Sequence, residues 1–153
     1  MQQRVAELSK PVLESAVQSR SPWRRRYLEQ SKEILNVTYF GCSSNPSTFS
    51  VVSSVIENVE KKCEELNYQI QEFPFYLNDL PGNDFNMLFQ GLSSFAERYK
   101  DLSLFTVGAP GSFHGWLFPT NSLHLVHSSY GAHWLSKMRL PILKYMLICY
   151  SCA

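Results

Sequence analysis

Residues 34–66 read ILNVTYFGCSSNPSTFSVVSSVIENVEKKCEEL, and three kinds of local structure follow one another in this run. Its first seven residues are rich in β-branched and aromatic side chains, which is typical of a buried strand over Ile34–Phe40. The next six, Gly41–Pro46, are small or turn-forming. From Phe49 to Leu66 apolar residues recur every three or four positions and charged residues occupy the other face, which predicts an amphipathic helix packed on a sheet.

The same alternation continues along the chain. Further strands are predicted at 73–77, 104–107 and 123–126, and helices at 2–18 (kinked at Pro11), 85–99 and 132–137. Strands that alternate with helices form parallel sheets with helices packed against them. The sequence therefore predicts an α/β fold, a Rossmann-like parallel sheet with flanking helices.

Charge and composition are those of an ordinary globular chain. The 153 residues carry a formal net charge of +1, and 44% of them are hydrophobic and 18% charged. This balance provides no electrostatic basis for a nucleic-acid partner, and the run Arg24–Arg26 is typical of a solvated turn. No apolar run approaches the length of a membrane span and no secretory leader opens the sequence, so we expect no membrane partner and a cytoplasmic location.

Polar side chains gather where the predicted strands end. The run LNDLPGNDFN begins at Leu77, and its Asp79 follows the second strand directly. A carboxylate at this place can accept hydrogen bonds from ribose hydroxyls, or it can begin the turn before Pro81. Asp84, five residues later, is typical of a helix N-cap.

Two aromatic motifs follow the later strands. In GAPGSFHGWLFP, from Gly108, Phe113 can stack on a purine-like ring beside Ser112, or it can be a buried aromatic under a loop. In VHSSYGAHWLS, from Val126, helical spacing puts three side chains on one face: Tyr130, His133 and Trp134. This face suits a flat substrate, although a core-facing aromatic stripe has the same pattern.

Histidines and cysteines do not form a metal motif. His124 and His127 point to opposite faces of a strand, so they and His133 are not expected to bind a metal ion together. Cys42 and Cys63 are isolated, and the pair Cys149 and Cys152 has no second pair with it. We expect free thiols and no metal.

These runs resemble consecutive motifs of the plant SABATH family, S-adenosylmethionine (SAM)-dependent methyltransferases that act on small carboxylic acids and xanthine alkaloids. The likeness covers residues 2–137 and implies the N-terminal half of the family's Rossmann-like methyltransferase domain. By this resemblance the cofactor SAM is bound by a set of six residues, Cys42, Ser47, Asp79, Leu80, Ser112 and Phe113. The substrate is bound by four others, Gln2, Tyr130, His133 and Trp134.

The resemblance also implies an activity: transfer of the SAM methyl group to the carboxylate of a small plant metabolite such as salicylate, benzoate or jasmonate, or to a xanthine-like substrate. A carboxylic acid is ionised at neutral pH, so such an enzyme needs no strong general base. The family is largely dimeric, so a homodimer or heterodimer is expected. The family's magnesium site is expected to be absent from this chain.

The sequence departs from the family pattern in its first turn. The pattern there looks like Asp-Leu-Gly-Cys-Ser-Ser-Gly-Pro-Asn, and this chain has Tyr39, Asn45 and Ser47 in place of its acidic residue, second glycine and asparagine. The likeness also stops at residue 137, which predicts a partial methyltransferase domain over 1–137 and a divergent tail over 138–153. An alternative is therefore a truncated, inactive relative that binds cofactor or pairs with a full-length homologue.

Overall fold

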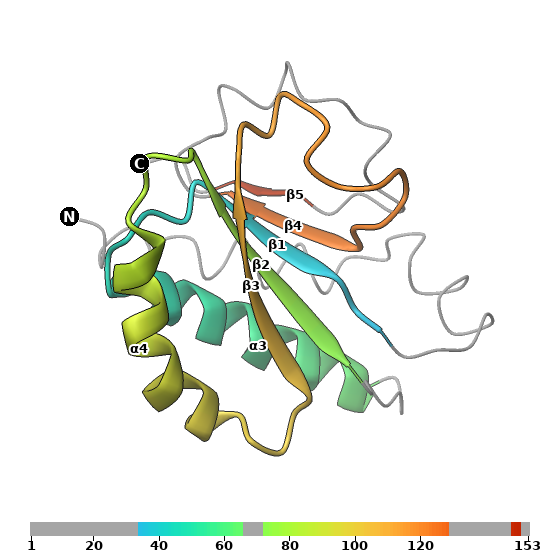
Figure 1. The fold of residues 1–153 in the computed structure, drawn as a ribbon. Coiled ribbons are helices and arrows are strands. Elements are labelled where there is room, and N and C mark those ends of the chain that lie inside the picture. The colour runs from blue at the N-terminus through green and yellow to red at the C-terminus, as the bar shows by residue number, and fades with distance from the viewer. Residues whose placement is uncertain (1–33, 66–71, 129–147, 151–153) are drawn as a thin grey trace.

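A computed structural model describes residues 34–65, 72–128 and 148–150 of the chain (Figure 1). Its elements in chain order are β1 (Val37–Phe40), α3 (Ser47–Glu65), β2 (Phe73–Asp79), α4 (Phe85–Arg98), β3 (Leu104–Pro110), β4 (Leu125–Ser128) and β5 (Ile148–Tyr150). The predicted helices at 2–18 and 132–137 lie outside the described residues.

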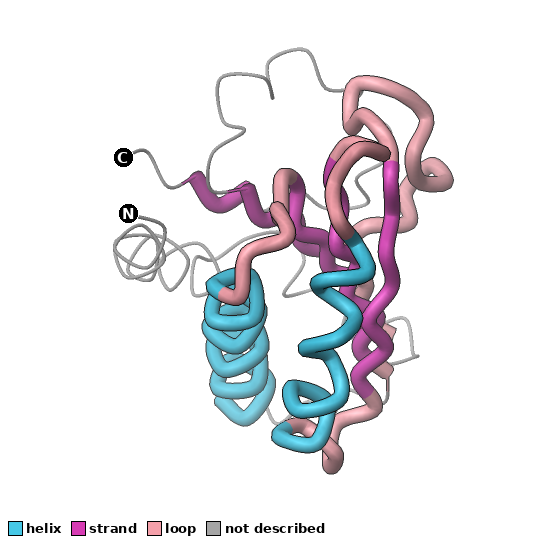
Figure 2. The backbone as a smooth tube through the Cα atoms, turned by 60° about the vertical axis from the view of Figure 1, so that its left-hand side comes forward, coloured by secondary structure: helices cyan, strands magenta, loops and turns pink. Residues whose placement is uncertain are grey.

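The strands form one sheet in the order β3-β2-β1-β4-β5, and every pairing in it is parallel. Two helical crossovers connect β1 to β2 and β2 to β3. Because both crossovers step in the same direction across the sheet, α3 and α4 pack on the same face of it (Figures 1 and 2). The predicted α/β class and parallel sheet are confirmed.

Element boundaries differ from the sequence-based prediction at the strand ends. The first strand begins at Val37 because Ile34 makes only an isolated bridge to Glu72. The second and third strands run two and three residues further than predicted, to Asp79 and Pro110, because they pair with each other over seven residues. Long-range pairing, which the local pattern does not report, extends both strands.

The tail of the chain contributes to the sheet. Strand β5 pairs in parallel with β4, with Val126 opposite Ile148 and Ser128 opposite Tyr150. Part of the predicted divergent tail is therefore a strand. The predicted boundary at residue 137 lies outside the described residues.

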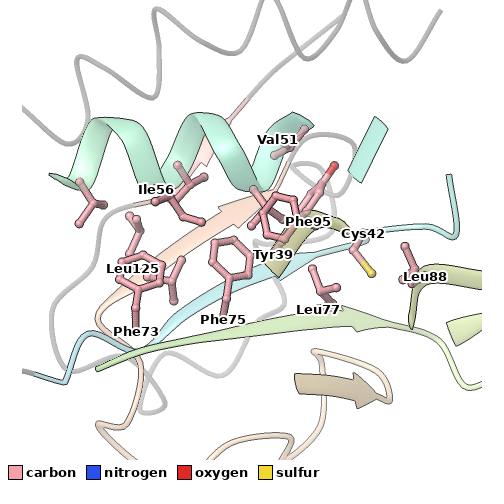
Figure 3. Packing of buried hydrophobic residues seen from close by; sticks show 14 of the residues in the cluster. Tyr39, Cys42, Val51, Ile56, Phe73, Phe75, Leu77, Leu88, Phe95 and Leu125 are labelled. Carbon is pink, nitrogen blue, oxygen red and sulfur yellow. The ribbon is translucent and has the colours of Figure 1, made fainter. Parts of the chain in front are cut away.

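The main core lies between the sheet and the two helices (Figure 3). Val55 and Ile56 of α3 and Phe73 and Phe75 of β2 are all 0% exposed. The apolar face of α3 that the sequence predicts is the face that is buried here. On the opposite face of the sheet a smaller cluster forms around Phe40, Phe118, Leu123 and Val126.

Helix α4 begins as the sequence predicts. Asp84 is its N-cap, and the carboxylate accepts a hydrogen bond from Met87 N at 3.1 Å. This contact satisfies one of the main-chain N–H groups that a helix start leaves unpaired. The prediction for Asp84 is confirmed.

Candidate functional site

The carboxyl ends of β1, β2 and β3 lie side by side at one edge of the sheet. Phe40 is opposite Asn78, and Asn78 is opposite Ala109. Strand β1 has β2 on one side and β4 on the other, so the chain changes direction across the sheet at β1. In open parallel sheets, ligands bind outside the carboxyl ends of the strands at such a point.

The turn after β1 is held in an uncommon backbone conformation. Gly41 has φ +72° and Ser43 has φ +60°. The main-chain N–H groups of Gly41 and Cys42 both donate to the carbonyl oxygen of Asn78, at 2.9 and 3.0 Å. The turn is therefore fastened to the end of β2, and its first position needs a glycine because a side chain is strained at that φ.

Asp79 joins two of these strand ends. Its Oδ2 accepts a hydrogen bond from Ser43 N at 2.7 Å, and its Oδ1 accepts one from its neighbour Leu80 N at 2.8 Å. The contact with Leu80 N belongs to the turn before Pro81 that the sequence predicts as one role for Asp79. The contact with Ser43 N links Asp79 to the turn after β1. A carboxylate can accept about four hydrogen bonds, so acceptor capacity remains for ligand hydroxyls.

The turn after β3 brings Ser112 and Phe113 to the same edge. Gly111 N donates to the carbonyl oxygen of Asp79 at 2.8 Å, which fastens this turn to β2 as well. Ser112 is exposed, and its hydroxyl accepts a hydrogen bond from His114 N at 3.3 Å. The half-buried ring of Phe113 stacks on Phe40, with ring centroids 5.2 Å apart.

Of the other predicted cofactor residues, Leu80 is 61% exposed at the site and Ser47 is the first residue of α3. Cys42 is part of the main core and is buried (Figure 3). Burial, reinforced by the Asp79 carboxylate, raises the pKa of the Cys42 thiol to about 12. The thiol is therefore protonated at neutral pH and has no nucleophilic role.

The position where the family pattern has an acidic residue is filled by an aromatic ring. Tyr39 is 5% exposed and packs within the main core. It meets His127 of β4 edge-on, with ring centroids 4.9 Å apart. Burial lowers the pKa of His127 to about 4, so the imidazole is neutral at physiological pH.

The four predicted substrate residues, Gln2, Tyr130, His133 and Trp134, lie outside the described residues. Within residues 34–65, 72–128 and 148–150, no group of three or more His, Cys, Asp or Glu side chains is placed to hold a metal ion. In the same part of the chain, no helix is long and apolar enough to cross a bilayer.

Sequence reasoning missed two residues of this edge, Asn78 and Ser43. Asn78 is completely buried and holds the turns on both sides of it, and Ser43 donates the long-range hydrogen bond to Asp79. Asparagine is uncommon inside strands, so its place between Leu77 and Asp79 was an available signal. Nothing local marks Ser43, because its partner lies 36 residues away.

Comparison with known proteins agrees with this geometry. The sequence pattern of the SAM-dependent carboxyl methyltransferases matches residues 1–146. A probable caffeine synthase 4 from Camellia sinensis is 51% identical over 138 residues, which cover 88% of this chain and 37% of that protein. A probable 7-methylxanthine methyltransferase 2 from Theobroma cacao is 48% identical over 134 residues, with coverages of 88% and 36%.

A solved structure has the same fold. A loganic acid methyltransferase with S-adenosylhomocysteine (SAH) superposes with a TM-score of 0.73 at 35% identity, over 88% of this chain and 36% of that one. The chain thus spans a little over a third of the length of the relatives it matches. It belongs to the SAM-dependent carboxyl methyltransferases, the SABATH family.

Proposed function

We propose that this chain forms the nucleoside-binding part of a SAM-dependent methyl-transfer site. The observation that carries the proposal is the Asp79 carboxylate at the switch point of the sheet, held by Ser43 N and Leu80 N. Both oxygens are oriented by these main-chain donors and keep capacity for further donors. Two adjacent ribose hydroxyls are the natural partners of such a group.

The chemistry of the surrounding residues fits the rest of the nucleoside. The Gly111 N–H fastens the turn of Ser112 and Phe113 beside Asp79, and a hydroxyl with an aromatic ring at this edge supports assigning these two residues to the purine. The exposed Leu80 side chain provides an apolar surface at the same edge. We assign Cys42 to the methionine end of the cofactor, and Ser47 to the cofactor site at the start of α3.

SAM supplies an electrophilic methyl group when it is bound. The residues of this chain contribute binding and orientation, which lower the barrier by holding the two reactants in line. For the acceptor we propose a planar, xanthine-like purine, because the relatives at 48–51% identity are named as caffeine synthases and a methylxanthine methyltransferase. Gln2, Tyr130, His133 and Trp134 would bind it.

A carboxylate acceptor of the salicylate, benzoate or jasmonate kind is the second candidate. The description of the family and the loganic acid methyltransferase favour it. The two acceptors differ in their proton chemistry. A carboxylate is already ionised, whereas a purine N–H has to lose a proton during transfer.

Calorimetric titration of the full chain with SAH tests the binding step. We expect saturable binding in the micromolar to millimolar range, and an absence of heat at millimolar SAH would refute the proposal. Methyl transfer from radiolabelled SAM to a panel of xanthines and of aromatic carboxylic acids then separates the two acceptors. Binding of SAH without transfer to either class would identify the chain as a cofactor-binding relative without turnover, and addition of a full-length homologue would test pairing.

A further inference from the structure

Asn78 lies at the centre of the candidate site. It is the second-to-last residue of β2, with Phe40 of β1 on one side of it and Ala109 of β3 on the other. Its exposed fraction is 0%. A polar side chain so deeply buried is unfavourable unless its hydrogen bonds are made.

The Asn78 side chain donates to two carbonyl oxygens of the β3 turn. Its Nδ2 lies 2.7 Å from Ala109 O and 2.9 Å from Gly111 O. Both amide hydrogens are therefore in use, and this fixes the orientation of the amide, because the flipped form would place Oδ1 against two carbonyl oxygens. Among the described residues, Oδ1 itself has no hydrogen-bond partner.

These bonds hold the chain immediately before Ser112 and Phe113. Gly111 adopts φ +149°, and its main-chain N–H also donates to the carbonyl oxygen of Asp79 at the end of β2. Loss of the Asn78 amide would remove both side-chain bonds that hold this turn to β2. The Asn78 amide thus satisfies two main-chain carbonyl oxygens of the β3 turn, although its own Oδ1 is buried without a partner among the described residues.

We propose that Asn78 is a positioning residue of the cofactor site: by holding Ala109 and Gly111, it sets where Ser112 and Phe113 meet the purine ring. This inference rests on the proposed function, because it concerns the same ligand. It assigns to Asn78 an effect on recognition of the purine, beyond its effect on stability.

The experiment compares two ligands that differ only on the purine. SAH carries an adenine amino group, and S-inosylhomocysteine has a carbonyl oxygen in its place. The affinity of each is measured by calorimetric competition for the wild type and for Asn78→Ala. Only folded molecules bind, so the ratio of the two affinities does not depend on how much of a variant is folded.

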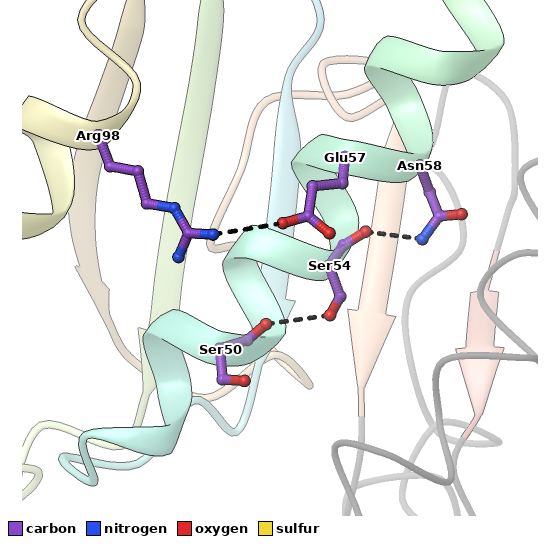
Figure 4. A network of polar contacts seen from close by, with 5 residues as sticks. All are labelled: Ser50, Ser54, Glu57, Asn58 and Arg98. Carbon is purple, nitrogen blue, oxygen red and sulfur yellow. Dashed lines mark hydrogen bonds and ion pairs between the residues drawn. The ribbon is translucent and has the colours of Figure 1, made fainter.

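Asn58→Ala is the matched control. Asn58 is a buried asparagine on α3 whose Nδ2 donates to a carbonyl oxygen, that of Ser54, at 2.8 Å (Figure 4). The substitution removes the same group at a place away from the strand ends. Thermal unfolding of both variants reports their loss of stability separately.

We expect the wild type to bind SAH more tightly than S-inosylhomocysteine. In Asn78→Ala this affinity ratio should fall about tenfold, because a small displacement of a positioned group is costly. In Asn58→Ala the ratio should stay as in the wild type. An unchanged preference in Asn78→Ala would overturn the inference, as would a wild type that binds both ligands equally well. A wild type that binds neither ligand would instead refute the proposed function. If Asn78→Ala does not fold, Asn78→Ser, whose short hydroxyl cannot make both bonds, takes its place.

Discussion

Asp79 accepts a hydrogen bond at 2.7 Å from the main-chain N–H of Ser43, a residue 36 positions earlier in the chain. Ser43 has φ +60°, a left-handed conformation that is uncommon for residues other than glycine. The carboxylate therefore stabilises a turn that would otherwise be unfavourable. One side chain thus shapes the end of β1 while it presents its remaining acceptor capacity at the sheet edge.

Replacement of Asp79 by asparagine removes one of its two acceptor oxygens. Either Ser43 N or Leu80 N then loses its partner, so we expect the free energy of unfolding to fall by about 1–2 kcal/mol. The affinity for SAH, measured by calorimetry, should fall at least about tenfold, because hydrogen bonds to a charged acceptor are the stronger ones.

Asp84→Asn is the control for that change. Asp84 caps α4 through Met87 N, and asparagine is as good an N-cap as aspartate. We expect stability within about 0.5 kcal/mol of the wild type and unchanged SAH binding. Equal SAH affinity in the Asp79 and Asp84 variants would show that Asp79 does not contact the ligand.

His127 should make the protein less stable in mild acid. Its pKa is about 4 in the folded protein, lowered by burial from its ordinary value of 6.5. The unfolded chain therefore binds this proton more readily. The stability that depends on neutral His127 is fully present above pH 6.5. It is lost as the pH falls from 6.5 towards 4, and the free energy of unfolding decreases by about 3 kcal/mol over this range.

Urea denaturation at several pH values between 7.5 and 4 measures how the free energy of unfolding changes with pH. His127→Phe keeps an aromatic ring beside Tyr39 and cannot take up a proton, so its stability should depend much less on pH in this window. Identical slopes for the two proteins would mean that other groups cause the acid sensitivity.

Gly41 and Gly82 provide a matched pair for backbone strain. A methyl group added at either position meets no atom within 4 Å, but only Gly41 has a positive φ, +72°. We expect Gly41→Ala to cost about 1 kcal/mol in thermal or urea unfolding, because an L side chain is strained at that φ. Gly82→Ala should stay within about 0.5 kcal/mol of the wild type, and equal effects would exclude strain as the cause.

Cys42 and Cys63 should resist alkylation in the folded protein. Burial raises their pKa values to about 12 and about 11, so almost no thiolate exists at pH 8. Iodoacetamide at pH 8 should leave both peptides unmodified in native protein and label both in denaturant, as mass spectrometry can measure. Labelling of native Cys42 at the denatured rate would contradict the burial described here.

Much of the fold could be predicted from local patterns. The apolar face of α3 follows from residues spaced three or four apart, and the N-cap of α4 follows from an aspartate placed just before it. Both depend on neighbours in the chain, so the sequence carries the whole signal. The strand ends at Asp79 and Pro110 were misjudged because seven pairs between β2 and β3 extend them.

For the candidate site too, some features could be predicted from local sequence and others depend on contacts between distant residues. Asp79, Ser112 and Phe113 could be singled out by residue type, since a carboxylate and an aromatic ring just after strands are typical of ligand sites. The sequence by itself thus determined the parallel α/β fold, the SABATH family and the candidate ligand-binding side chains. Only the tertiary structure decided that Ser43 bonds to Asp79, that Asn78 fastens Gly111, and that the Tyr39 ring is buried against His127. Each of these contacts joins residues brought together by the pairing of strands, and no local pattern of residues records which strands will be neighbours.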